Sequence, residues 1–158
     1  MAITTENSTQ YARTVATPSK KVAVPDWHAR LRFMFFEFAQ GSSAGDAGSI
    51  ARLIRLPAGR CRVILPLSRL SWTAMGSSRT MDLGWEAYTD ENGAAVAVDP
   101  NGLDDGIDVS SAGNVIPAGT IGVHETKLFD SQDGVVITAQ INDGTIPAAD
   151  TIDGSVAY

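Results

Sequence analysis

The chain has 158 residues, of which 44% are hydrophobic and 19% charged, with a formal net charge of −6 and a single cysteine. This length and composition predict one folded domain with its own core and exclude a disordered chain. One cysteine excludes an internal disulfide, and no run approaches the ~20 apolar residues of a membrane helix. The N-terminus has no apolar run that would suggest a secretory signal. We therefore expect a soluble protein made in a reducing cytoplasm.

Charge is distributed unevenly along the chain. Residues 1–81 hold eleven of the twelve Lys and Arg against four acids, whereas residues 82–158 hold one lysine against fourteen acids. Nine of the twelve bases are arginine, which suits paired bonding to carboxylates. An arginine-rich segment also occurs in nucleic-acid-binding proteins, but the acidic half would repel a polyanion. We predict no nucleic-acid partner.

The first 26 residues differ in composition from the rest of the chain. They are mostly polar, and Pro18 and Pro25 favour extended backbone. We predict an extended arm over residues 1–26 that becomes ordered when it lies on a partner, followed by one domain over residues 27–158. A frayed terminus without a role is the alternative.

The domain opens with a strand over residues 28–39. Leu31, Phe33 and Phe35 alternate with residues of the other face. Because Phe36 and Phe38 make that second face apolar too, we expect a central strand, covered on both sides in its second half.

Two arginine-bearing strands follow, "IARLIRLP" (residues 50–57) and "RCRVILPL" (residues 60–67), joined by a tight turn that predicts a hairpin. Cys61 points inward in this register, whereas Arg60 and Arg62 point outward. Arg52 and Arg55 fall on opposite faces of their strand. Burying an unpaired charge costs several kcal/mol, so these arginines need partners.

The remaining elements are short. Further strands are predicted over residues 67–75, 80–88, 120–129, 134–142 and 151–158, with a hairpin turn at residues 90–93. Residues 99–114 read as a long loop with at most one helical turn. About eight short strands separated by turns predict an all-β antiparallel sandwich or jelly roll.

Nothing in the sequence indicates catalysis. The two histidines lie in no recognisable motif, and Cys61 is expected to be a buried, inert thiol. Asp82 and Glu86 would lie roughly 13 Å apart along one strand, too far for a usual catalytic pair. The acidic stretch from Asp99 lacks the ligand spacing of a calcium loop. We predict no enzymatic activity, no cofactor and no metal.

Three aromatic residues, Trp72, Trp85 and Tyr88, allow two interpretations. Packing in the core or against another subunit is favoured. If they were exposed, they could stack on sugars, and the chain would be a non-catalytic receptor- or glycan-binding module of a head fibre or tail.

Three stretches, "ARLIRLPAGRCRV", "TMDLGWEAYTDENG" and "GVVITAQINDGTIPAADTIDGSVAY", together resemble small tailed-bacteriophage proteins that decorate or cement capsids. The resemblance covers about residues 50–158; the arm, the Phe-rich first strand and residues 99–119 depart from it. It implies a jelly-roll-like fold, self-association often as trimers, and a structural role on the capsid exterior after assembly in the host cytoplasm. The major capsid protein and further copies of the chain are the implied partners, with no membrane involved.

The residues themselves point to the same kind of contact. Arginines of the first half are expected to meet carboxylates of a neighbouring copy or of the capsid, although pairing within one subunit remains open. The residues expected at this interface are Tyr11, Arg13, Lys20, Lys21, Arg52, Arg55, Arg60 and Arg62.

Overall fold

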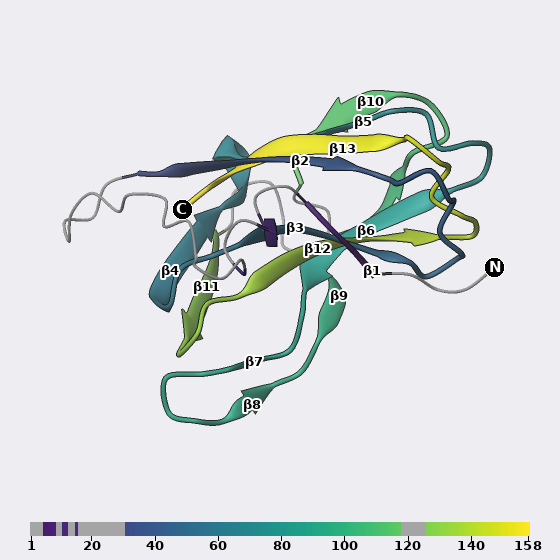
Figure 1. Cartoon of the computed structure of the whole chain (residues 1–158). Helices are drawn as coiled ribbons and strands as arrows, with labels where there is room; N and C mark the ends of the chain where they lie inside the picture. The colour runs from purple at the N-terminus through teal and green to yellow at the C-terminus, as the bar shows by residue number, and fades with distance from the viewer. Residues whose placement is uncertain (1–4, 9–10, 13–14, 16–30, 118–125) are drawn as a thin grey trace.

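The computed structural model describes residues 5–8, 11–12, 15, 31–117 and 126–158 (Figure 1). Within them the chain forms strands, one short 3₁₀ helix, η1 (Leu65–Leu67), and helical backbone at Tyr11, Ala12 and Val15. The strands are β1 (Thr5–Asn7), β2 (Phe33–Ala39), β3 (Ile50–Arg55), β4 (Gly59–Ile64), β5 (Arg69–Trp72), β6 (Thr80–Trp85), β7 (Tyr88–Thr89), β8 (Ala95–Val96), β9 (Asp99–Asp108), β10 (Gly113–Val115), β11 (Thr126–Ser131), β12 (Val136–Asn142) and β13 (Thr151–Ala157).

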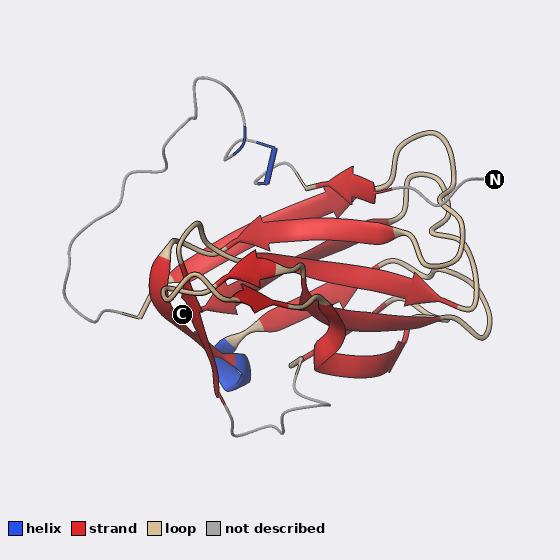
Figure 2. Ribbon diagram, turned by 90° about the horizontal axis from the view of Figure 1, so that it is seen from below, coloured by secondary structure: helices blue, strands red, loops and turns tan. Residues whose placement is uncertain are grey.

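Two sheets face each other and form the predicted all-β sandwich (Figure 2). The first sheet has the order β1-β3-β12-β6-β9 and the second β10-β5-β13-β2. Eight of these strands, β2, β3, β5, β6, β9, β10, β12 and β13 in chain order, form four nested pairs. The pairs are β2 with β13, β3 with β12, β5 with β10 and β6 with β9. That nested pairing is the topology of a jelly roll.

The core lies between the two sheets. It is built from alternate residues of the strands, because successive side chains of a strand point to opposite faces. Phe38, Leu53 and Ile137 are completely buried within it. A second group of aromatic rings, Trp85 and Phe129, belongs to the same apolar cluster.

The predicted arginine hairpin does not form. β3 pairs with β1 and β12 in the first sheet, whereas β4 pairs with β11 in a separate two-stranded ribbon at one end of the molecule (Figure 1). Both edges of β3 are already paired, with β1 and β12, so β4 cannot lie beside it. After β3, the N–H of buried Leu56 donates to the carbonyl oxygen of Val135 at 2.8 Å. The hairpin predicted around residues 90–93 is present as β7 and β8.

Residues 99–114, predicted to be a loop, contain two strands of the jelly roll, β9 and β10. β9 pairs with β6 through two register shifts, so its buried residues, Leu103, Asp104 and Ile107, do not alternate regularly. One of its two glycines is required by packing, because a Cβ at Gly102 would lie 2.2 Å from the ring of Trp85. Tertiary packing here overrides the poor strand propensity of Asp, Gly and Pro.

The first strand of the jelly roll, β2, is an edge strand and not the predicted central one. Its only partner among the described residues is β13. Phe36 and Phe38 point into the core, but Phe33 and Phe35 are 47% and 67% exposed on the outer face. The strand is apolar on both faces, and the described residues cover only one of them.

Residues 5–8 lie along the edge of β3. β1 pairs with β3 in parallel, and the N–H of Ser8 donates to the carbonyl oxygen of Arg52 at 2.7 Å. The hydroxyl of the fully buried Ser8 also donates to the carbonyl oxygen of Leu53 and accepts a bond from the N–H of Tyr11. This part of the predicted arm therefore docks on the chain's own domain.

Candidate functional site

Arg52 brings the N-terminal segment and the domain together. Its Nε lies 2.5 Å from Glu86 Oε1, with both side chains half-buried. Its guanidinium carbon lies 5.2 Å from the centre of the Tyr11 ring, a cation–π contact. Two of the predicted interface residues, Tyr11 and Arg52, thus contact each other within one chain.

Arg55, at the end of β3, holds the turn that precedes β12. Its Nε and Nη2 donate to the carbonyl oxygen of Asp133 at 3.0 and 2.6 Å. The backbone approaches closely here, because a Cβ at Gly134 would lie 2.2 Å from the carbonyl oxygen of Leu56. Arg55 bonds to a neutral oxygen, so its charge is not offset by this contact.

The β4–β11 ribbon, called the arginine ribbon below, carries Arg60 and Arg62 on its outer side. Arg60 is directly opposite Asp130, with Nη2 3.1 Å from Oδ2. Arg62 donates from Nη1 to the hydroxyl oxygen of Thr126 at 2.9 Å and faces Leu128, which is 41% exposed. Both arginines are exposed, so each is accessible to a partner.

The oppositely charged halves of the sequence therefore meet inside one chain. Each of the four arginines bonds to a residue of the second half, as expected where β3 pairs with β12 and β4 with β11. Arg52 and Arg60 bond to carboxylates. Within the described residues, Arg55 and Arg62 have no carboxylate at ion-pair distance. Arg13, Lys20 and Lys21 lie outside the described residues.

The aromatic residues pack in the core, as the favoured interpretation had it. Trp72 and Trp85 are 8% and 5% exposed, and Tyr88 packs against the core cluster. Trp72 donates from Nε1 to the carbonyl oxygen of Ser111 at 2.9 Å. The ammonium of Lys127 lies 4.3 Å from the centre of the Trp85 ring. Neither tryptophan presents a ring face on which a sugar could stack.

Cys61 is buried on the inner side of β4, as predicted. Burial raises the pKa of its thiol to about 11 from the ordinary 9.0, with Arg32 opposing the shift. We expect the native protein at pH 8 to react with a thiol reagent about a hundredfold more slowly than the unfolded chain, because the thiolate is the nucleophile.

The same shift predicts that stability falls with increasing pH. The folded state favours the neutral thiol, so its contribution is full below pH 9.0 and is lost as the pH rises to about 11. Urea unfolding at pH 8 and pH 11, compared with Cys61→Ala, measures this difference. Equal labelling rates in native and unfolded protein would contradict the assignment.

The two acids considered for catalysis have separate structural partners. Asp82 accepts bonds from Asn142 Nδ2 at 2.6 Å and from the N–H of Gly106 at 2.9 Å, whereas Glu86 pairs with Arg52. Asp82 of β6 and Asp104 of β9 are both buried, which the sequence pattern did not reveal. In the described ranges, no group of three or more His, Cys, Asp or Glu residues could hold a metal ion.

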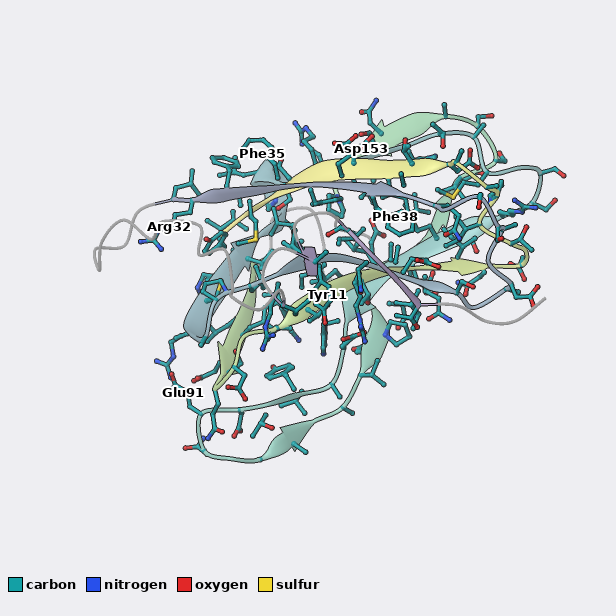
Figure 3. All side chains as sticks on the ribbon, viewed as in Figure 1. Tyr11, Arg32, Phe35, Phe38, Glu91 and Asp153 are labelled. Atoms are coloured by element: carbon teal, nitrogen blue, oxygen red, sulfur yellow. The ribbon has the colours of Figure 1, made fainter. Side chains whose placement is uncertain are left out.

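A further surface was missed at the sequence level: the outer face of the second sheet along β2. Leu31, Phe33 and Phe35 are 50%, 47% and 67% exposed there. Figure 3 shows Phe35 on the outer side of β2. The alternation that places them on one face is visible in the sequence. What the sequence could not show is that no part of the described fold covers this face.

Comparisons with known proteins identify the fold. No family model and no curated protein sequence matches the chain. A chain in the capsid asymmetric unit of cyanophage Pam1 shares the fold with a TM-score of 0.52 at 12% identity, covering 91% of this chain and 96% of that one. A chain of infectious bursal disease virus, Gx strain, matches with a TM-score of 0.41 at 16% identity, and 34% of its length is covered. Over the described residues, no helix has the length and apolarity needed to cross a membrane.

Proposed function

We propose that the chain is a virion structural protein that decorates a phage capsid and stabilises it by binding across neighbouring capsomers. The observation that carries this proposal is the jelly roll shared with the Pam1 capsid chain over nearly the full length of both proteins. The similarity extends over the whole domain, because 91% of this chain and 96% of the Pam1 chain are covered.

The arginine ribbon supplies a surface suited to such binding. Arg62 is exposed, and among the described residues it bonds only to the neutral hydroxyl of Thr126, so a carboxylate on a partner would gain a charge-assisted hydrogen bond. Leu128 beside it adds exposed apolar area. An exposed base next to an apolar side chain fits an acidic protein surface, here proposed to be that of the major capsid protein.

The N-terminal arm is the second part of the proposal. Its residues Arg13, Lys20 and Lys21 are proposed to contact the capsid or a neighbouring copy, and the protein is proposed to be a homotrimer. Tyr11 and Ser8 hold the beginning of the arm on β3. That anchor would fix the point from which the later arm residues reach a partner.

Co-sedimentation with undecorated, expanded capsids from the same source tests this function. We expect saturable binding that weakens at high salt, because screening reduces the contribution of exposed charges. Arg62→Gln should weaken binding about tenfold, the cost of one hydrogen bond to a charged group. Arg69→Gln removes the same charge from β5 of the second sheet and serves as the control.

Two outcomes count against the proposal. A folded, oligomeric protein that does not bind capsids would place the chain elsewhere on the virion, in the tail or a fibre. Equal binding by Arg62→Gln and the wild type would remove the arginine ribbon from the interface.

A further inference from the structure

The backbone hydrogen bonds of β2 show which of its residues bond to β13 and which point to the open edge of the sheet. Arg32 and Tyr158 exchange both backbone hydrogen bonds, at 2.8 and 2.9 Å, and Gln40 donates to the carbonyl oxygen of Asp150 at 2.9 Å. In an antiparallel pair such hydrogen-bonded positions recur at every second residue. The even-numbered residues of β2 therefore bond to β13. The N–H and C=O groups of Phe33, Phe35 and Glu37 point to the open edge.

The same odd-numbered residues carry the exposed side chains. Phe33 and Phe35 stack with ring centres 6.5 Å apart on the outer face, and Leu31 precedes them. Figure 3 shows Phe35 and Phe38 on opposite sides of β2. A seven-residue apolar edge strand invites pairing with another strand, and natural proteins cover or blunt such edges. Along β2 the described residues provide no such cover.

Acidic side chains follow the aromatic pair. Glu37 lies directly opposite Asp153 of β13, on the same outer face. Burial and the charge of Glu37 both raise the pKa of Asp153, and Asp153 Oδ1 is buried without a hydrogen bond from the described residues. A strand added beside β2 would therefore gain from two apolar residues facing Phe33 and Phe35, followed by a base facing Glu37.

One stretch of this sequence has that pattern in the required direction. Lys20, Val22 and Val24, read antiparallel, face Glu37, Phe35 and Phe33 respectively. These residues lie outside the described part of the chain, so the match is one of sequence. The match also agrees with the bonding pattern of β2. Residues that face Phe33, Phe35 and Glu37 must donate their backbone N–H groups to this edge, and Lys20, Val22 and Val24 each have one. Pro25, which has none, would point away from β2, whereas Pro18 would end the pairing.

We propose that residues 20–24 of one copy add to the β2 edge of a neighbouring copy as an antiparallel strand, with Lys20 facing Glu37. The inference deepens the proposed function, on which it rests for self-association. Pairing within one copy would need residues 27–30, Trp-His-Ala-Arg, as the hairpin loop, and these lack the Gly, Asn and Asp that such loops use.

Exchange of arms is compatible with two kinds of closed assembly. Two copies can swap arms reciprocally in a two-fold dimer, or each can pass its arm to the next copy head-to-tail around a closed ring, such as the proposed trimer. Pairing of two β2 edges with each other would give a two-fold dimer in which the arms take no part. The seven steps from Val24 to Leu31 span at most about 25 Å, so neighbouring β2 strands must begin within that distance.

Disulfide trapping in the full chain, without capsids, tests the proposal. Val22→Cys combined with Phe35→Cys should form disulfides between copies under mild oxidation, seen as covalent oligomers on a non-reducing gel. Phe35 is exposed, so its replacement leaves the core intact, and the native Cys61 is buried. The control pairs Ala23→Cys with Phe35→Cys, because the side chain of residue 23 would lie on the opposite face.

Amide exchange provides a readout that does not depend on disulfide geometry. The N–H groups of Phe33, Phe35 and Glu37 should be protected in the assembled wild type. Val22→Pro removes an N–H aimed at β2 and should speed their exchange at least about tenfold. Ala23→Pro, whose N–H points away, should have little effect.

The results of these experiments distinguish which strand occupies the edge of β2. A disulfide within one copy overturns arm exchange in favour of a copy's own arm, and a dimer that persists in Val22→Pro overturns it in favour of β2–β2 pairing. Equal cross-linking by the control overturns the register. Unprotected odd-numbered amides in the wild type overturn the docking altogether. Since none of these results involves capsids, each is independent of the co-sedimentation experiment.

Discussion

Replacing Phe38 by alanine is expected to lower the free energy of unfolding by about 3–5 kcal/mol, whereas replacing Phe35 should change it by less than about 0.5 kcal/mol. The two residues are three apart on β2. Phe38 is completely buried between the sheets, and Phe35 is 67% exposed. The large cost at Phe38 combines lost burial with a cavity that the surrounding side chains fill only in part. Urea unfolding at one low protein concentration measures both values.

Phe35→Ala also tests whether the outer face of β2 contributes to self-association and not to folding. If the outer face of β2 contacts a neighbouring copy, this variant should keep the unfolding midpoint of the isolated chain and weaken only self-association. Sedimentation velocity over a range of concentrations separates the two effects. A large loss of stability in Phe35→Ala at low concentration would show that the ring is buried within one chain.

Gly84→Ala should be among the most damaging single-methyl changes in the chain. A Cβ at Gly84 would lie 1.9 Å from the carbonyl oxygen of Asp99 and 2.4 Å from the carbonyl carbon of Pro100. Because these are backbone atoms, β6 and β9 would have to separate, at a cost of about 3 kcal/mol or more. Thermal unfolding followed by circular dichroism measures the loss.

Gly41→Ala is the control for Gly84→Ala. No atom lies within 4 Å of a Cβ at Gly41, so this substitution should leave stability within about 0.5 kcal/mol of the wild type or raise it slightly. A similar midpoint for both variants would contradict the close approach of β6 to β9.

The sequence predicted the strands whose apolar residues alternate regularly. β3, β6, β12 and β13 lie within the predicted ranges, and Cys61 is buried as its register indicated. The predicted number of about eight strands agrees with the jelly roll, but the membership differs. β4 and β11 were counted and form the separate arginine ribbon, whereas β9 and β10 were missed.

The missed strands have a physical explanation. β9 is rich in Asp and Gly, and its register shifts against β6 remove the alternation from which a strand is recognised. What favours the strand is distant in sequence: the ring of Trp85 over Gly102, and the bond from Gly106 to Asp82. Such long-range contacts leave no local pattern in the sequence.

The partners of the arginines were also beyond sequence reasoning. Charge segregation between the halves of the chain is compatible with pairing inside one copy or between copies. Choosing between them requires the strand pairing, which places Arg60 opposite Asp130 and Arg52 beside Glu86. The edge position of β2 was equally hidden, because an alternating apolar pattern does not show whether a strand pairs on one side or on both.

The pairing of β2 with β13 has a consequence for how the chain is made. These strands are the first and last of the jelly roll, more than about a hundred residues apart in sequence, and β13 also separates β2 from β5. A nascent chain therefore holds the aromatic β2 without its partner until β13 leaves the ribosome. Folding that waits for such distant contacts is slow, in the millisecond-to-second range for small β-proteins. The second sheet can therefore form around β2 only after β13 has been synthesised.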